Sequence, residues 1–269
     1  MPRRTPKNIK SFMNAVPVAV GLYLIVVFGI FWLAYSGAQA MGYNWQWYRM
    51  PQYFYTLTDD GFQWGEIMVG LVKTIQLSVT AFFFATLLGL IVALLRLSGL
   101  VVGGAVAVGF LEFVRNMPIL VLLYLFYYVL GPVFDLDRYT ASVMCLAVFH
   151  AALISEIFRA GINSVPKGQW EGAKSVGMSK AQTYRYIILP QSVKFMLPPM
   201  TGEMVHLIKS SAIVSVIAVV ELTTIGRNLI SDTYMSFEIW FTIAAVYLVL
   251  TLILSIGVSR IEAKYAVQT

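Results

Sequence analysis

Three polar residues on the fifth apolar run of the sequence have the types and spacing that could recognise a charged small molecule. Glu203, His206 and Lys209 stand at i, i+3 and i+6, and Ser210 and Ser211 follow directly. On a helix, residues three apart are neighbours, so Glu203 meets His206 and His206 meets Lys209. Ionised side chains are costly in lipid and face a bundle interior or a cavity. The pattern predicts either a polar lining, in which Lys209 attracts an anionic solute, or an internal ion-pair network that positions the helix.

The fourth apolar run carries two further groups of ionisable residues. Glu156 and Arg159 stand at i, i+3 near its end, where an ion pair would brace the connection that follows. His150 lies further inside the run, with no second histidine or carboxylate at metal-ligand spacing near it. An interior histidine with satisfied hydrogen bonds is one interpretation of His150 among several of equal weight, and we expect no metal site. Cys145 is the only cysteine, which excludes an internal disulfide.

The sequence has no motif of a nucleotide-binding or catalytic centre. The stretch from Gly65 through Gly70 to Lys73 approaches a phosphate-binding loop, but two residues separate the second glycine from the lysine that must follow it directly. No His-Glu-x-x-His motif, nucleophilic serine turn or facing carboxylate pair occurs in or near an apolar run. We therefore expect neither an enzyme nor a bound cofactor, and any ATP used must be hydrolysed by another subunit.

The composition places these residues in a membrane protein. Of the 269 residues, 59% are hydrophobic and 12% are charged, and the mean hydropathy is +0.76. A soluble domain of this length has too little core to bury so many apolar side chains. Six apolar runs approach or reach the length of about 20 residues that a spanning helix needs: Val16–Tyr35, Ile75–Leu95, Met117–Phe134, Tyr139–Ser155, Met196–Val220 and Ile239–Val258. We expect Leu100–Leu111 to extend the helix of the third run.

The beginning of the chain leaves two alternatives open. Val16–Tyr35 could belong to a cleaved signal peptide, but its 20 residues exceed the roughly 7–15 apolar residues of such peptides, which favours an uncleaved helix. The segment Tyr43–Tyr55 is dense in tryptophan, tyrosine and phenylalanine. Such residues gather at the membrane–water boundary, so the segment predicts an aromatic belt, with an aromatic-rich soluble loop as the alternative.

The distribution of basic residues predicts how the chain is oriented in the membrane. Counted over alternate connections, 14 of the 19 Lys and Arg residues lie on one side of the membrane and three on the other. The first group is Arg3, Arg4, Lys7, Lys10, Arg96, Arg115, Arg159, Lys167, Lys174, Lys180, Arg185, Lys194, Arg260 and Lys264. The second group is Arg49, Arg138 and Arg227. Because cytoplasmic loops carry the excess of basic residues, we expect both termini in the cytoplasm. The same placement accounts for the net charge of +6 without a nucleic-acid partner.

The long basic connection Arg159–Lys194 contains residues that typically begin and end helices, and they predict two short helices. Gly177 suits a left-handed end for a helix over Gln169–Val176. Ser179, with a glutamine three residues later, has the capping-box pattern that begins a second helix. Pro190 is expected to stop that helix. These features alone fit a compact loop packed on its own bundle as well as a docking element for a partner.

The residues of this connection resemble the coupling-loop motif of permease subunits of ATP-binding-cassette (ABC) importers. That motif reads Glu-Ala-Ala, a glycine after three residues, and Ile-x-Leu-Pro after nine more. The matching residues are Glu171, Gly172, Ala173, Gly177, Ile187, Leu189 and Pro190. Both spacings match, and Gly172 in place of alanine is the one departure, which destabilises the first helix by up to about 1 kcal/mol. The resemblance implies a partner ATPase that docks here and carries the ATP and Mg²⁺.

A wider resemblance, from about residue 70 to residue 262, is to the polar amino-acid branch of these binding-protein-dependent permeases. The stretches that carry it are Leu95–Ser98, Glu112–Leu120, Ser155–Ile162, Val165–Gln169, Leu189–Gln191, Leu197–Pro199 and Leu207–Ala212. Within the branch, Arg115–Pro118 and Pro198–Met204 are most similar to glutamate/aspartate importers. The resemblance implies an all-α integral membrane fold of six transmembrane helices, in which a five-helix type I permease core (66–262) follows an additional N-terminal region (1–65).

The function that the resemblance implies is the permease of an ATP-driven importer for acidic or polar amino acids in the bacterial inner membrane. Two ATP-binding subunits would dock on the loop, a second permease, identical or homologous, would complete the pathway, and a soluble binding protein would deliver the amino acid. The alternative is a secondary carrier coupled to an ion gradient. The sequence lacks the repeated broken helices of such carriers, and that alternative leaves the long basic connection without a role.

Overall fold

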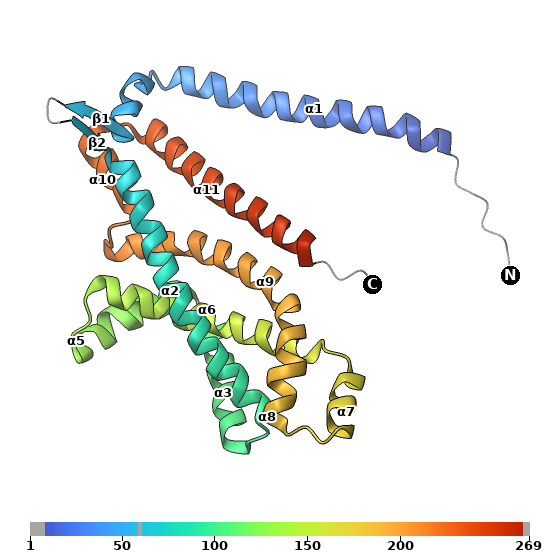
Figure 1. Ribbon diagram of the computed structural model, residues 1–269. Coiled ribbons are helices and arrows are strands. Elements are labelled where there is room, and N and C mark those ends of the chain that lie inside the picture. The colour runs from blue at the N-terminus through green and yellow to red at the C-terminus, as the bar shows by residue number, and fades with distance from the viewer. Residues whose placement is uncertain (1–8, 59–60, 266–269) are drawn as a thin grey trace. The chain divides into compact units, whose positions relative to one another are not determined.

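The computed structural model describes residues 9–58 and 61–265, and the chain divides into two compact units, Met1–Gln46 and Trp47–Thr269. The described part of the first unit contains one helix, α1 (Ile9–Ala40), drawn in blue in Figure 1. Its segment Pro17–Ala40 is long and apolar enough to cross a membrane, and its side chains are mostly exposed, as lipid contact requires. The basic residues Arg3, Arg4 and Lys7 of the predicted cytoplasmic tail lie outside the described residues.

Three long helices frame the second unit: α2 (Glu66–Leu97), α6 (Arg138–Asn163) and α11 (Ser236–Tyr265). Each is long and apolar enough to cross a membrane. Helices α2 and α6 lie close together because Gly89 has no side chain: a Cβ there would stand 2.8 Å from Cγ2 of Ile154. These helices contain three of the predicted runs, Ile75–Leu95, Tyr139–Ser155 and Ile239–Val258.

A sharply bent helix pair stands where the third span was predicted. It consists of α3 (Val101–Arg115) and, after a turn, α4 (Ile119–Tyr124), the π-helical η2 (Leu125–Leu130) and α5 (Gly131–Phe134). The two parts meet at 106°, so the expectation that Leu100–Leu111 extends the helix of Met117–Phe134 is wrong. Asn116 ends α3, its Nδ2 donating to the carbonyl oxygen of Glu112 at 2.7 Å, and Pro118 begins the new direction because it has no amide hydrogen to donate.

A second bent pair follows the basic connection. Its elements are α7 (Lys167–Ser175), α8 (Lys180–Thr183), the π-helical turn η3 (Tyr184–Ile188), α9 (Leu189–Ser210), the 3₁₀ turn η4 (Ser211–Ile217) and α10 (Leu222–Thr233). The expectation that Pro190 stops a short helix is wrong, because α8 continues through η3 into α9. Pro190 lies in the first turn of α9, where a missing amide hydrogen is tolerated. The predicted span Met196–Val220 therefore begins inside a longer helical segment, which breaks by 45° before α10.

By length and composition, four helices among the described residues can cross a membrane, or up to six if each bent pair is one span. This agrees with the predicted all-helical membrane fold and its six apolar runs. The predicted orientation of the termini stays a prediction.

The sequence did not predict a small hairpin that precedes α2. The 3₁₀ helix η1 (Trp47–Tyr53) leads into strands β1 (Tyr55–Thr58) and β2 (Gly61–Trp64), which pair antiparallel with Tyr55 opposite Trp64. The rings of Tyr55, Phe62 and Trp64 are exposed, and the ring of Phe62 contacts the other two, as suits a membrane boundary. Met50 and Tyr53 pack in one core with residues of α2, α10 and α11, and the second compact unit begins at Trp47.

Candidate functional site

The turn between α7 and α8 has the geometry that the sequence predicts. Gly177 has φ +75°, and no atom lies within 4 Å of the position a Cβ would take. The amide of Met178 donates to the carbonyl of Ala173 and the amide of Gly177 to that of Lys174, both at 3.0 Å. These two bonds make a Schellman motif, in which a left-handed residue ends the helix and satisfies its last carbonyl groups.

The helix that follows begins with the predicted capping box. The hydroxyl of Ser179 accepts from the amide of Gln182 at 3.3 Å, and the side-chain oxygen of Gln182 accepts from the amide of Ser179 at 2.9 Å. Each side chain thus satisfies an amide that has no partner within the helix. The chain direction is fixed on both sides of Gly177.

Side-chain packing holds α7 against η3. The rings of Trp170 and Tyr184 meet edge to face, with centroids 5.2 Å apart, and Ile188 is fully buried in the same core. Nε2 of Gln191 donates a hydrogen bond, 3.2 Å long, to Oε1 of Gln169 and so links the start of α9 to α7. The same core includes residues of α6 and α9, so the helix–turn–helix is packed firmly against the helices on both sides of it.

The seven residues of the predicted coupling motif divide between a core face and an outer face. Ala173 is buried and Ile187 is half-buried, whereas the exposed members are Glu171, Gly172, Gly177, Leu189 and Pro190. Two bulky apolar side chains of the same connection are also exposed, Val176 at 73% and Tyr186 at 60%. Exposed apolar side chains outside the spanning helices are a feature of surfaces that bind another protein.

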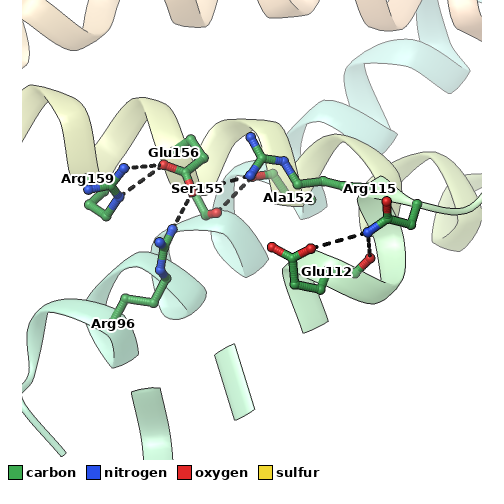
Figure 2. Close-up of polar contacts among 8 residues, drawn as sticks. Arg96, Glu112, Arg115, Ala152, Ser155, Glu156 and Arg159 are labelled. Atoms are coloured by element: carbon green, nitrogen blue, oxygen red, sulfur yellow. Dashed lines mark hydrogen bonds and ion pairs between the residues drawn. The ribbon is translucent and has the colours of Figure 1, made fainter. Parts of the chain in front are cut away.

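Just before α7, one carboxylate binds three arginines (Figure 2). Glu156 accepts from Arg159 on its own helix at 2.7 and 3.0 Å, as predicted, and it is also hydrogen-bonded to Arg96 at the end of α2. Arg115, at the end of α3, stands 3.8 Å from the same carboxylate. Three basic residues that the sequence assigned to one side of the membrane thus lie together. The cluster ties α2, α3 and α6 at the base of the loop.

Sequence analysis missed the roles of Arg96 and Arg115, which it counted only for orientation. Arg96 lies in the last turn of α2 and Arg115 in the last turn of α3. The planar guanidinium group of arginine binds a carboxylate with better geometry than the ammonium group of lysine does. Their position at helix ends was the one signal available. The pairing with Glu156, 60 residues away from Arg96, depends on the packing of α2 against α6.

The polar residues predicted on the fifth run lie on α9, except Ser211, which begins η4, and they differ in exposure. Glu203 is largely enclosed, with 12% of its side chain exposed, whereas His206 is half exposed and Lys209 is exposed. Ser210 donates to the backbone carbonyl of His206, and Ser211 is fully buried with its hydroxyl on a backbone carbonyl. The open polar face of α9 therefore consists of His206 and Lys209, and Ser211 does not belong to it.

Across the helix interface, the ring of His150 on α6 meets Glu203. Its Nδ1 lies 2.5 Å from Oε1 of Glu203, and Nδ1 of His206 lies 3.6 Å from the same oxygen. The expectation of a satisfied interior histidine holds for one ring nitrogen only, because the buried Nε2 of His150 has no partner among the described residues. The contact joins residues 53 positions apart, which spacing along the sequence does not reveal.

A buried carboxylate that sequence analysis passed over fixes the last bend of the chain. Glu221 caps α10 by accepting from the amides of Thr223 at 2.8 Å and Thr224 at 2.6 Å. The hydroxyl of Tyr247, on α11, donates to the same carboxylate at 3.0 Å. The local sequence, Glu-Leu-Thr-Thr, gave little signal, because glutamate is not among the usual N-cap residues. These hydrogen bonds hold α10 against α11.

Comparison with known proteins identifies the fold. Residues 85–267 match the family described as binding-protein-dependent transport system inner membrane component. The chain belongs to this family. It is 36% identical over 198 residues to the probable glutamine ABC transporter permease protein GlnM of Bacillus subtilis, an alignment that covers 73% of this chain and 92% of the relative. Membership makes the chain a multi-pass inner-membrane translocation subunit that works with ATPase subunits and a binding protein and has no catalytic centre of its own.

Two further likenesses extend this family assignment. The glutamate/aspartate import permease protein GltJ of Escherichia coli is 29% identical over 245 residues, which cover 84% of this chain and 96% of GltJ. A solved structure titled as an amino acid ABC transporter with histidines has a chain 38% identical to this one, with a TM-score of 0.70 over 74% of this chain and 93% of that one. The family match begins at residue 85, so α1 lies outside it.

Proposed function

We propose that this permease imports polar amino acids, and that glutamine, glutamate and aspartate are the substrates to test first. The observation that carries the proposal is the open polar face of α9, where His206 and Lys209 are exposed in a bent helix pair that, taken together, is long and apolar enough to span a membrane. A charged side chain in lipid is costly, so this face must border the pathway or a second permease. A cation there suits the carboxylate that every amino acid carries.

The relatives support two finer alternatives for the substrate. The relative from Bacillus subtilis, described as a glutamine permease, has the higher identity, 36%. GltJ, described as a glutamate/aspartate permease, has 29% identity but aligns over 84% of this chain rather than 73%. We propose acidic amino acids as the finer alternative, because the alignment with GltJ covers more of this chain than the alignment with GlnM.

The proposed assembly contains two ATPase subunits and two permease chains, with the binding protein on the opposite side of the membrane. In it, the outer face of the helix–turn–helix docks on an ATPase: Val176 and Tyr186 supply apolar contact, and Glu171 is the one acidic residue between Arg159 and Lys194. A single acidic side chain among basic ones gives the docked helix one preferred orientation against a basic or amide-rich wall. Gly177 then sets the angle between the two short helices.

The experiment that tests this function is uptake into proteoliposomes. The purified permease–ATPase complex is reconstituted with ATP inside and binding protein outside, and labelled glutamine, glutamate, aspartate and leucine are offered separately. We expect ATP-dependent uptake of at least one of the three polar amino acids and none of leucine. Uptake of leucine alone would contradict the proposed substrate class, and competition between unlabelled glutamine and glutamate separates the two finer alternatives.

A further inference from the structure

The fold brings both histidines of the chain to one carboxylate. The sequence contains two histidines, His150 and His206, 56 positions apart. Their rings, one on α6 and one on α9, have centroids 5.4 Å apart, and Glu203 lies against both. One donor atom from each of the three residues lies within 4.8 Å of the other two. This is the only group of three or more such side chains found among the described residues.

The donor set and its spacing suit a divalent transition metal. Zinc binds imidazole nitrogen at about 2.0–2.1 Å and carboxylate oxygen at about 2.0–2.2 Å, which places neighbouring tetrahedral donors roughly 3.4 Å apart. The distance of 3.6 Å from Nδ1 of His206 to Oε1 of Glu203 already fits. The 2.5 Å contact of His150 with Glu203 must open by about 1 Å for the same geometry. A rotation of the Glu203 side chain, which is not fully buried, can supply that change.

The orientation of the His150 ring decides which of its nitrogens can bind an ion. The residue is fully buried, and Nδ1 faces the carboxylate that it shares with His206. Nδ1 is therefore the nitrogen that the site uses. Nε2, on the other side of the ring, has no hydrogen-bond partner among the described residues and takes no part in the site.

We propose that His150, Glu203 and His206 bind one divalent cation of the zinc class. Two imidazoles and a carboxylate favour zinc and its transition-metal neighbours over magnesium or calcium, which prefer oxygen donors alone. The half-exposed ring of His206 leaves the site open on one side, so a cation can enter and a fourth position stays free for water. Because His150 lies on α6 and the other two ligands on α9, the bound ion ties these helices together.

The binding test uses the permease–ATPase complex carrying a tag without histidine. After treatment with a chelator, the complex is titrated with Zn²⁺ by calorimetry, and cobalt is used as an optical probe of the coordination. We expect the wild type to bind one more zinc per permease chain than the variant His206→Ala, whose half-exposed site tolerates the change. Even a lost outer-shell partner costs about 10–100-fold in metal affinity, so a lost ligand must cost at least that.

Matched variants complete the test. Lys209→Met, one turn further along α9, removes a charge but no ligand, and should bind zinc at least as tightly as the wild type. Glu203→Gln should weaken binding as His206→Ala does. X-ray absorption at the zinc edge should show two imidazole nitrogens and a carboxylate in the wild type. Equal zinc binding by wild type and His206→Ala, or absence of the additional zinc, would overturn the proposal whatever the chain transports.

A consequence for transport rests on the proposed function. If α6 and α9 move against each other during import, a bound ion that joins them must slow uptake. We expect added Zn²⁺ to reduce uptake by the wild type, a chelator to restore it, and Glu203→Gln, whose side chain is largely enclosed and lies outside the open polar face, to be resistant. Equal inhibition of both proteins would refute the bridging role.

Discussion

The backbone of Gly177 offers the sharpest test of the coupling loop. At φ +75°, an L-residue with a side chain costs about 1–2 kcal/mol, and a β-branched one costs more. No atom lies within 4 Å of the added Cβ, so the penalty of Gly177→Val comes from the backbone and not from a collision. If the turn relaxes to escape this strain, it loses two hydrogen bonds worth about 1 kcal/mol each. Either response changes the angle between α7 and α8.

The assay is uptake and ATP hydrolysis by the reconstituted complex. We expect Gly177→Val to insert normally, because the turn lies outside the spanning helices, and to lose at least about 90% of uptake, a loss of 1.4 kcal/mol in coupling. The ATPase should either dissociate or hydrolyse ATP without uptake. Gly177→Asn should keep most uptake, since asparagine tolerates the left-handed conformation.

Gly172→Ala is the matched control. It lies in α7 with open space around it, completes the Glu-Ala-Ala pattern, and should transport normally with a helix up to about 1 kcal/mol more stable. Normal uptake by Gly177→Val would refute the reasoning, because the turn would then have no mechanical role.

Three further outcomes test other parts of the account. Glu171→Lys should reduce uptake less than Gly177→Val, because it changes a charge and leaves the turn intact; a greater loss than that of Gly177→Val would contradict this order. Lys209→Met should lower uptake at least tenfold with assembly and basal ATP hydrolysis retained, whereas an unassembled variant would indicate an ion-pair network that positions α9. Thiols introduced at Lys7, Lys174 and Lys264 should react only from the cytoplasmic side, and labelling of any of them from outside intact cells would overturn the orientation.

The elements that the sequence predicts well depend on local physics. Apolar length alone places the long helices, since lipid demands about 20 such residues. Gly177 and Ser179 fix their turn through their own backbone and side chains, so their geometry is predictable from neighbouring residues. Pro190 shows the limit of such rules, because the π-helical turn before it lets the helix continue.

The features that sequence reasoning missed are long-range contacts. Glu156 meets Arg96 only because α2 packs against α6, and His150 meets Glu203 only because α6 packs against α9. Neither pair can be recognised from the spacing of its residues along the sequence. Asn116 and Pro118 are residues that often break a helix. The apolar stretches on both sides nevertheless favoured one continuous helix, so the break was not predicted.

The most direct test of the central claim is the energy source of uptake. Proteoliposomes containing the complex, with ATP inside and binding protein outside, are treated with ionophores that abolish ion gradients, and uptake of the polar amino acid is followed. An importer driven through the helix–turn–helix by a docked ATPase must continue to accumulate substrate, and must stop when ATP is replaced by a non-hydrolysable analogue. Uptake that persists without hydrolysable ATP and collapses with the ionophores would contradict the account.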